Sequence, residues 1–398
     1  MTDSQAVVEL TGGPQDVLTL HHPGPVRRVK LPNGVPAWLV TRHAEVREAL
    51  NDLRLSNRDQ DDWFDQGALS PQVKAAMNTS MLRIDPPDHT RMRKLAAKAF
   101  VPRRVETLRP RVRQLTGDLL DQLDQLAAAG TVADLIAKYA SPLPVQVMCE
   151  LLGVAVEDRD SYRHWADAFT AGVGAPVFPV QEVTDFVEHL RGLVAHRRAE
   201  PDDALLSALI AARDETDRLS EDELISTAFL FLVAGHETTT NLIGNGIYML
   251  LRVPERADRI RAHPEELERA IEEFLRYEGP VTGAALRTAT CTMDLFGAGV
   301  AAGDLVIMSL RAANRDGSVF SEPDEFQLDR DRSPHLAFGH GIHFCMGAPL
   351  ARVEAEIAIG DFLTRFPQAR LAVAPDTIQW RPGILTRGLA DLPVALRG

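Results

Sequence analysis

The stretch Phe338-Gly-His-Gly-Ile-His-Phe-Cys-Met-Gly347 places one cysteine, Cys345, in a glycine-rich turn directly before a long predicted helix. That helix spans residues 347–366 and has small side chains along one side. The free N–H groups and the positive dipole end of a helix N-terminus both stabilise a thiolate, and glycines allow a close approach of the backbone. The pattern suits a cysteine sulfur held against a large flat cofactor. The alternative is a small buried cysteine, which is the commoner state of an isolated one.

Two further interpretations of this stretch are weaker. A zinc site would need further ligands beside the cysteine. Three histidines lie near it in the sequence, namely His335, His340 and His343. Their spacing, however, fits no common zinc pattern. A dinucleotide-binding loop begins with Gly-x-Gly, as residues 339–341 do, but Phe344 stands where the third glycine is required.

A second unusual segment, Ala234-Gly-His-Glu-Thr-Thr239, lies in the middle of another long predicted helix. That helix begins at Ser220 with a capping-box pattern and can run to Arg252. Burying Glu237 in its apolar stripe is costly unless the acid is paired or functional. Thr238 can donate its hydroxyl to a carbonyl of the preceding turn and bend the helix. We therefore expect a groove there with proton-carrying groups beside it, or else a solvated kink. A zinc-protease motif fails because residue 240 is Thr.

The composition is that of a globular protein. Of 398 residues, 45% are hydrophobic and 25% charged, which excludes collagen-like and broadly disordered chains. The net charge of −13 argues against nucleic acid as the main partner. The longest strongly apolar run, residues 228–235, is far shorter than the about 20 residues of a membrane span. An odd number of cysteines and no recognisable signal peptide predict a cytoplasmic protein.

The periodicity predicts a mainly α chain with a smaller β-rich part. A hairpin is expected at residues 29–40, within a β-rich N-terminal region at about 25–60. Residues 59–87 lack periodicity and are predicted as a loop. Helices are expected over most of the bulk at about 89–280, interrupted at Pro142 and Pro144, and short strands at 294–309. No repeat or linker divides the chain, so residues 1–398 are predicted to form a single domain.

Two ordinary pairs complete the set of motifs. One pair is Glu273-x-x-Arg276 and the other is His89 with Arg93. Each pair places two polar side chains on one helical face, which alone is unremarkable for a surface helix. These pairs, the two segments above and the segment Pro323-Asp-Glu-Phe326 with Arg330 occur in the order found in cytochromes P-450. The chain resembles a soluble bacterial member of that family over essentially its whole length.

The resemblance implies a cytochrome P-450 fold, heme b and a heme-ligand loop at residues 338–347. Cys345 would be the thiolate ligand of the heme iron. Glu237 and Thr238 would manage water and protons for bound O2. A structural network would comprise Glu273, Arg276 and Arg330. The heme propionates and heme pocket would be contacted by His89, Arg93, Arg287, His343, Phe338, Gly339, Ala234 and Gly235.

The resemblance also implies redox partners. Between Arg91 and Arg113 the sequence has nine Arg or Lys residues and one acid, Glu106. Such a basic face would steer an acidic ferredoxin, supplied by a ferredoxin reductase. A merely solvated helical face is the alternative. We expect a monomer with neither a nucleic-acid nor a membrane partner.

The family layout gives the candidate substrate pocket. Many of its residues are small or apolar, which favours a large apolar substrate: Met77, Met81, Leu82, Ile84, Phe169, Val177, Phe178, Val233, Val281, Thr282, Ala284, Ile384 and Leu385. Residues 145–153 and 276–281 resemble those of actinomycete enzymes that tailor macrolide and polyene polyketides. Hydroxylation is the first expectation and epoxidation the second. A terpenoid or steroid-like substrate is the nearest alternative. A non-catalytic heme sensor or carrier is the alternative of another class, but it would not need the Glu237–Thr238 pair.

Overall fold

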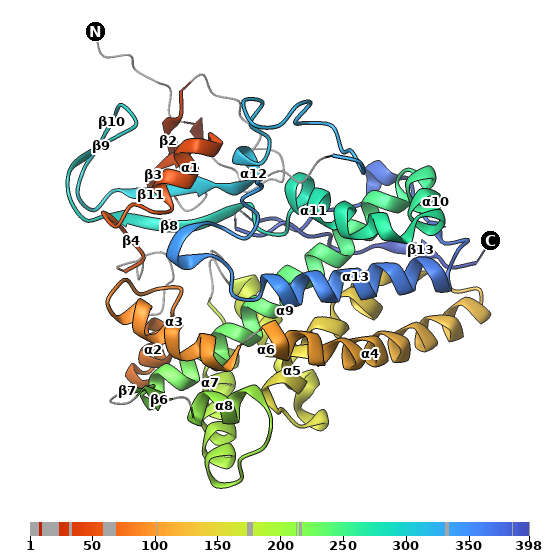
Figure 1. The fold of residues 1–398 in the computed structure, drawn as a ribbon, viewed down its shortest axis with the longest axis horizontal. Helices are drawn as coiled ribbons and strands as arrows, with labels where there is room; N and C mark the ends of the chain where they lie inside the picture. The colour runs from red at the N-terminus through yellow and green to blue at the C-terminus, as the bar shows by residue number, and fades with distance from the viewer. Residues whose placement is uncertain are drawn as a thin grey trace.

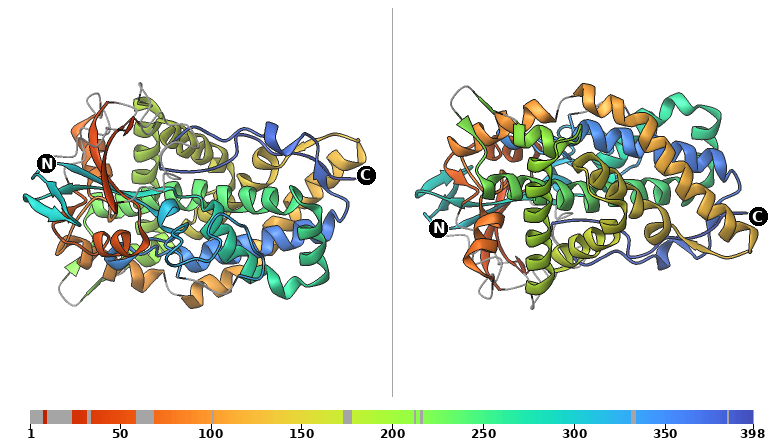
Figure 2. Two further views of the ribbon diagram at one scale, coloured as in Figure 1. Left: turned by 90° about the horizontal axis from the view of Figure 1, so that it is seen from above. Right: turned by 90° about the horizontal axis from the view of Figure 1, so that it is seen from below.

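A long central helix organises the molecule. The computed structural model describes residues 8–9, 24–31, 34–58, 69–100, 102–172, 178–211, 213–214, 217–330, 334–383 and 385–397. The largest β-sheet lies at one end of the molecule, helices make up most of the rest, and α9 (Glu221–Leu251) runs through the middle (Figures 1 and 2). No helix in these ranges has the length and hydropathy needed to cross a bilayer.

The capping box predicted at Ser220 is confirmed. The Ser220 hydroxyl accepts from the Glu223 backbone N–H at 3.2 Å, and the Glu223 carboxylate accepts from the Ser220 N–H at 2.7 Å. The 31-residue helix is apolar over most of its surface because other helices pack around it. Its neighbours include α5 (Pro142–Leu152), α11 (Leu267–Glu278) and α13 (Ala348–Arg365).

The remaining helices follow the predicted order with two corrections. Residues 59–87 are not a loop throughout, because α2 occupies Pro71–Asn78 and is capped by Ser70. Pro142 and Pro144 do not interrupt a helix but lie in the first turn of α5, where no intrahelical N–H is required. The other α-helices are α1 (His43–Ala49), α3 (Asp88–Ala99), α4 (Pro102–Ala128), α6 (Arg159–Gly172), α7 (Val180–Ala199), α8 (Leu205–Ala211), α10 (Pro254–Ala262) and α12 (Leu310–Ala313). Shorter helical turns are the π-helix η2 (Ile136–Ala140) and the 3-10 turns η3 (Val156–Asp158), η4 (Pro264–Glu266), η5 (Gly341–His343) and η6 (Pro375–Thr377).

The main sheet joins two distant parts of the chain. Its strand order is β1-β2-β3-β11-β8-β4. The predicted hairpin is confirmed as β2 paired antiparallel with β3, and β11 pairs parallel with β3 and antiparallel with β8. The region at about 25–60 therefore holds only part of this sheet. The strands are β1 (Val8–Glu9), β2 (Val26–Lys30), β3 (Pro36–Val40), β4 (Leu55–Ser56), β8 (Gly283–Ala289) and β11 (Leu305–Ser309).

Three smaller sheets are found in the described ranges. A hairpin forms from β9 (Met293–Leu295) and β10 (Ala298–Val300). Near the C-terminus, β12 (Arg370–Leu371) and β13 (Pro393–Ala395) pair with β5 (Ala133–Asp134). The strands β6 (Arg213–Asp214) and β7 (Asp217–Arg218) pair with each other. The largest hydrophobic cluster surrounds α9, and two smaller ones involve the strands of the main sheet.

A buried ion network ties α11 to the segment before the cysteine loop. Glu273 is 3% exposed and accepts from Arg276 twice, each at 2.7 Å, and from Arg330 Nε at 3.1 Å. The remaining Arg276 N–H groups donate to the carbonyl oxygens of Asn314, Pro323 and Glu325. All five donors of the guanidinium are thus used, which no lysine could reproduce.

We expect Glu273→Gln to destabilise the protein strongly. The substitution leaves two buried guanidinium groups without their counter-charge, which costs about 3–5 kcal/mol. Urea unfolding followed by circular dichroism measures the loss in free energy of unfolding. The control, Glu265→Gln, removes an exposed carboxylate near the start of the same helix and should change stability by less than about 0.5 kcal/mol. Equal effects of the two substitutions would contradict this account of the network.

Candidate active site

The loop that carries Cys345 folds back on itself. The Cys345 backbone N–H donates to the Phe338 carbonyl oxygen at 2.9 Å. Two turns make this possible, because Gly339 and Gly341 have φ angles of +72° and +74°. A Cβ atom at Gly341 would also lie 2.3 Å from the Asn51 Oδ1 atom, so the loop approaches the end of α1 too closely for a side chain.

The Cys345 side chain is exposed at the start of α13. Protein atoms nevertheless crowd the sulfur, and their desolvation raises the pKa of the thiol above its usual range. The N–H groups of Gly347 and Ala348 and the positive charge of Arg93 act in the opposite direction, as the sequence predicts, but do not outweigh it. A metal cation bound to the sulfur is the strongest influence that would favour the thiolate.

Side chains from several helices hold this loop in place. Arg93 donates to the Phe344 carbonyl oxygen, and the Arg352 guanidinium lies over the Phe338 ring at 4.5 Å. Glu272 on α11 accepts from Arg352 at 2.6 Å and from His335 at 3.1 Å. Burial alone would raise the pKa of Glu272, but these two partners hold it at about 2. Sequence reasoning missed Glu272, because it is one acid among many on an amphipathic helix.

The histidines of the loop do not gather into a zinc site. Each turns to a different partner: His335 to Glu272, His340 to Arg47 and His343 to Asn57. Within the described ranges, no three His, Cys, Asp or Glu side chains are placed to hold a metal ion together. The zinc interpretation is therefore not supported.

Buried cationic and imidazole groups converge near the loop from three parts of the chain. The rings of His89 on α3 and His343 lie 4.1 Å apart, centre to centre. Both nitrogens of His89 are buried and make no hydrogen bond in the described part of the chain. Arg287 on β8 is 3% exposed, and its burial lowers the pKa of the guanidinium to about 10. Buried groups of this kind require an anionic or hydrogen-bonding partner, and the two carboxylates of a heme fit that requirement.

The middle of α9 carries the predicted acid and alcohol. The Thr238 hydroxyl donates to the Ala234 carbonyl oxygen at 2.5 Å, as expected. Glu237 is buried, and its Oε1 atom accepts from the Thr386 hydroxyl at 3.1 Å and lies 3.8 Å from the Arg381 guanidinium. Desolvation raises the pKa of Glu237 above its usual range, and the Arg381 charge opposes that shift. A buried carboxyl with a raised pKa is a candidate for proton transfer.

Gly235 has a packing role in addition to the predicted one. A Cβ atom there would lie 2.8 Å from the Met148 sulfur on α5, so the glycine allows α9 and α5 to pack closely. The next residue, His236, is buried and contacts Ser141 at 3.2 Å and Asp167 at 3.7 Å. Desolvation lowers the pKa of His236 to about 4.

The candidate substrate-pocket residues lie in different surroundings. Met77 and Met81 are buried in the main core, Ile84 is partly buried and Leu82 is 58% exposed. Phe169 packs edge-to-face on Phe178 and Phe229. Val233 on α9 and Leu385 near the C-terminus are partly buried. Val281 and Thr282, between α11 and β8, are partly buried and buried respectively. Val177 and Ile384 lie outside the described residues, and for Ala284 only the backbone is described.

The basic segment at residues 91–113 is partly neutralised by acids from elsewhere in the chain. Arg91 pairs with Glu223, Arg109 with Glu356 at 3.0 Å and Arg111 with Glu150 at 2.5 Å. The exposed cations on the described surface of this segment include Lys94, Lys98 and Arg113. The positive face is therefore narrower than the sequence suggests.

Comparisons with known proteins agree with this geometry. A family model described as Cytochrome P450 matches residues 179–387. Cytochrome P450 107B1 of Saccharopolyspora erythraea is 46% identical over 376 residues, covering 93% of this chain and 92% of that protein. A mycinamicin IV hydroxylase/epoxidase of Micromonospora griseorubida is 42% identical, covering 93% and 92%. The solved structure of the Bacillus subtilis bacillaene polyketide synthase cytochrome P450 PksS has a TM-score of 0.85 and 37% identity, covering 94% of each chain. The chain belongs to the cytochrome P450 family and is a monooxygenase that binds heme b.

Proposed function

We propose that the chain, acting as a single domain, inserts one oxygen atom of O2 into a large apolar polyketide of the macrolide or polyene type. The heme supplies the activation of O2 when it is bound. Cys345 is its thiolate ligand in this proposal. The observation that supports the site best is the His89 ring, which lies against His343 of the cysteine loop with both nitrogens buried and without a hydrogen bond in the described part of the chain.

The heme-binding residues have distinct tasks in this proposal. The two propionates are bound by two arginines and two histidines: Arg93, Arg287, His89 and His343. Planar guanidinium groups and imidazole N–H groups are suitable donors to carboxylates. Phe338 and Gly339 of the cysteine loop, with Ala234 and Gly235 of α9, would contact the ring in this proposal. Glu273, Arg276 and Arg330 act through the fold rather than through the cofactor.

Glu237 and Thr238 deliver protons. The buried Glu237 carboxyl is connected through Thr386 and Arg381 to the C-terminal part of the chain. Thr238 has its hydroxyl hydrogen on the Ala234 carbonyl, which leaves the oxygen free to accept from water. A carrier or sensor of heme has no use for a buried acid, so the pair favours the monooxygenase over that alternative.

The chemistry of the candidate pocket residues and the relatives both support the substrate class. The aromatic cluster around Phe169 and Phe178 is apolar, and none of the candidate pocket residues is charged. One relative is named for hydroxylation and epoxidation of mycinamicin IV, and one solved structure belongs to bacillaene polyketide biosynthesis. Hydroxylation is the first reaction to test and epoxidation the second. A terpenoid or steroid-like substrate remains the second candidate class, since the same apolar surfaces would accept it.

We expect the reduced protein with CO to show the far-red-shifted Soret band of a thiolate-ligated heme. Cys345→Ser removes the soft sulfur ligand and should abolish that band. Cys291→Ser is the matched control, because Cys291 is also exposed and free. Absorbance spectra of the three proteins after dithionite and CO give the answer. A thiolate-type band that survives in Cys345→Ser would refute the ligand assignment.

Thr238→Ala should divert electrons to peroxide. Without the hydroxyl, water and protons are no longer positioned, so product formed per NADPH consumed should fall about tenfold while heme content is unchanged. Thr227→Ala is a close control, since the Thr227 hydroxyl makes the same kind of bond to the Glu223 carbonyl oxygen on the same helix. Peroxide and product are both measured with surrogate redox partners. Equal coupling in both variants would contradict the assigned role.

We propose that ferredoxin docks on the face carrying Lys94 and Lys98, with a ferredoxin reductase upstream. Reversing both charges, Lys94→Glu with Lys98→Glu, should raise the KM for ferredoxin about tenfold and reduce its dependence on salt, because steering is electrostatic. Lys138→Glu serves as a control on another exposed segment. The KM for ferredoxin is measured from steady-state turnover at several salt concentrations in the parent, the double variant and the control. An unchanged KM in the double variant would argue for another docking face.

A further inference from the structure

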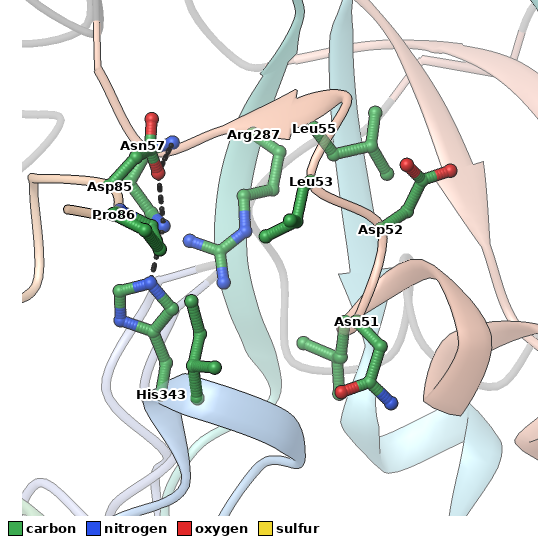
Figure 3. Close-up of a pocket in the computed structure, with 11 residues that line it drawn as sticks. Asn51, Asp52, Leu53, Leu55, Asn57, Asp85, Pro86, Arg287 and His343 are labelled. Carbon is green, nitrogen blue, oxygen red and sulfur yellow. Dashed lines mark hydrogen bonds between the residues drawn. The ribbon is translucent and has the colours of Figure 1, made fainter. Parts of the chain in front are cut away.

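A small cavity with both polar and apolar walls lies beside His343. Its walls come from the segment after α1, from the turn before α3, from β8 and from the cysteine loop. Figure 3 shows the Arg287 guanidinium and the His343 ring at this cavity, with Asn57 and Asp85 beside them. Its volume of about 110 Å³ holds a few water molecules but not a macrocycle. The side chains here therefore act on the heme site through His343 and Arg287 rather than by enclosing the ring.

Asp85 fixes the orientation of the Asn57 amide. The carboxylate accepts from the Ser56 hydroxyl, from the Asn57 backbone N–H at 3.0 Å and from the Asn57 Nδ2 atom at 3.2 Å. Burial would raise the pKa of Asp85, but these donors keep it below its usual range, so the carboxylate only accepts. The amide group of Asn57 must then turn its NH2, and not its oxygen, toward Asp85.

The same nitrogen atom of Asn57 reaches His343. Asn57 Nδ2 lies 2.8 Å from His343 Nε2 (Figure 3). The NH2 group has two hydrogens, one for Asp85 and one for the imidazole. A hydrogen on Nε2 would face that donor directly, so Nε2 must accept and the ring hydrogen must lie on Nδ1. The His89 ring, tilted by 44° at a centroid distance of 4.1 Å, restricts the imidazole further.

We propose that Asp85 and Asn57 are positioning residues for heme binding, because together they fix the His343 ring in the Nδ1–H tautomer. This inference rests on the proposed role of His343 as a propionate ligand. The Nδ1–H group is then the ring's only donor, and in this proposal it is the group that would donate to a propionate. If the Asn57 amide were reversed, the tautomer would change and the donor would be turned away from the propionate.

The first test measures the tautomer and does not depend on turnover. In the reduced, CO-bound protein, which is diamagnetic, 15N-labelled histidine reports which ring nitrogen of His343 carries hydrogen. We expect Nδ1–H in the parent and a mixture or the Nε2–H form in Asp85→Asn, where an amide replaces the fixed acceptor. The matched control, Asp52→Asn, changes a carboxylate of the same cavity that pairs with Arg54 instead. Nε2–H in the parent would overturn the proposal.

The second test measures heme loss to apomyoglobin. Asn57→Leu should accelerate it roughly five- to tenfold, the usual effect of one lost hydrogen bond, whereas Asp52→Asn should not. In a His343→Phe background, Asn57→Leu should have no further effect, because it acts through the imidazole. If Asn57→Leu still accelerated heme loss in the His343→Phe background, or did not change heme loss on its own, the positioning role of Asn57 and Asp85 would be refuted. If the parent protein lacked the thiolate-type CO band, the proposed heme site would be refuted instead. The His343 tautomer measured in the heme-free chain would then still decide the positioning role.

Discussion

The buried pairing of one carboxylate with two guanidinium groups is the interaction on which the site depends. Glu273 on α11 holds Arg276 and Arg330, and these arginines bind the backbone carbonyls of the segment that leads to the cysteine loop. Each charge is nearly fully buried, so the loss of any member leaves an unpaired charge in a medium of low polarity. The network thereby ties α11 to a long irregular segment of the chain.

From that fixed segment the loop reaches its neighbours through single, well-directed contacts. Glu272, one residue before Glu273, binds Arg352 on α13 and His335 at the start of the loop. Arg352 in turn covers Phe338, whose carbonyl accepts from the Cys345 N–H. The position of the sulfur thus follows from a chain of contacts that begins in α11. The heme-facing groups are fixed in advance of the cofactor, which lowers the cost of ordering them when it binds.

Polar groups at the heme site are left incompletely satisfied by the protein itself. His89 has two buried nitrogens without hydrogen bonds in the described part of the chain, and Arg287 is buried beside it. By contrast, His343 has one nitrogen committed to Asn57. The two histidines are therefore not equivalent, although their rings are in contact and sequence reasoning gave them the same role. Their difference arises from Asp85, an acid that the sequence pattern did not single out.

The sequence by itself determined the helical class, the capped 31-residue helix, the hairpin and the position of Cys345 before a helix, because these follow from local periodicity and capping. It also carried the motifs of the family in the right order. Only the tertiary structure decided that β11 joins the N-terminal hairpin, that Pro142 begins α5 instead of interrupting a helix, and that Glu272, Asp85 and Asn57 support the loop. These features depend on contacts between residues far apart in the chain, where a single acid or amide has no local pattern that distinguishes it from a solvated surface group.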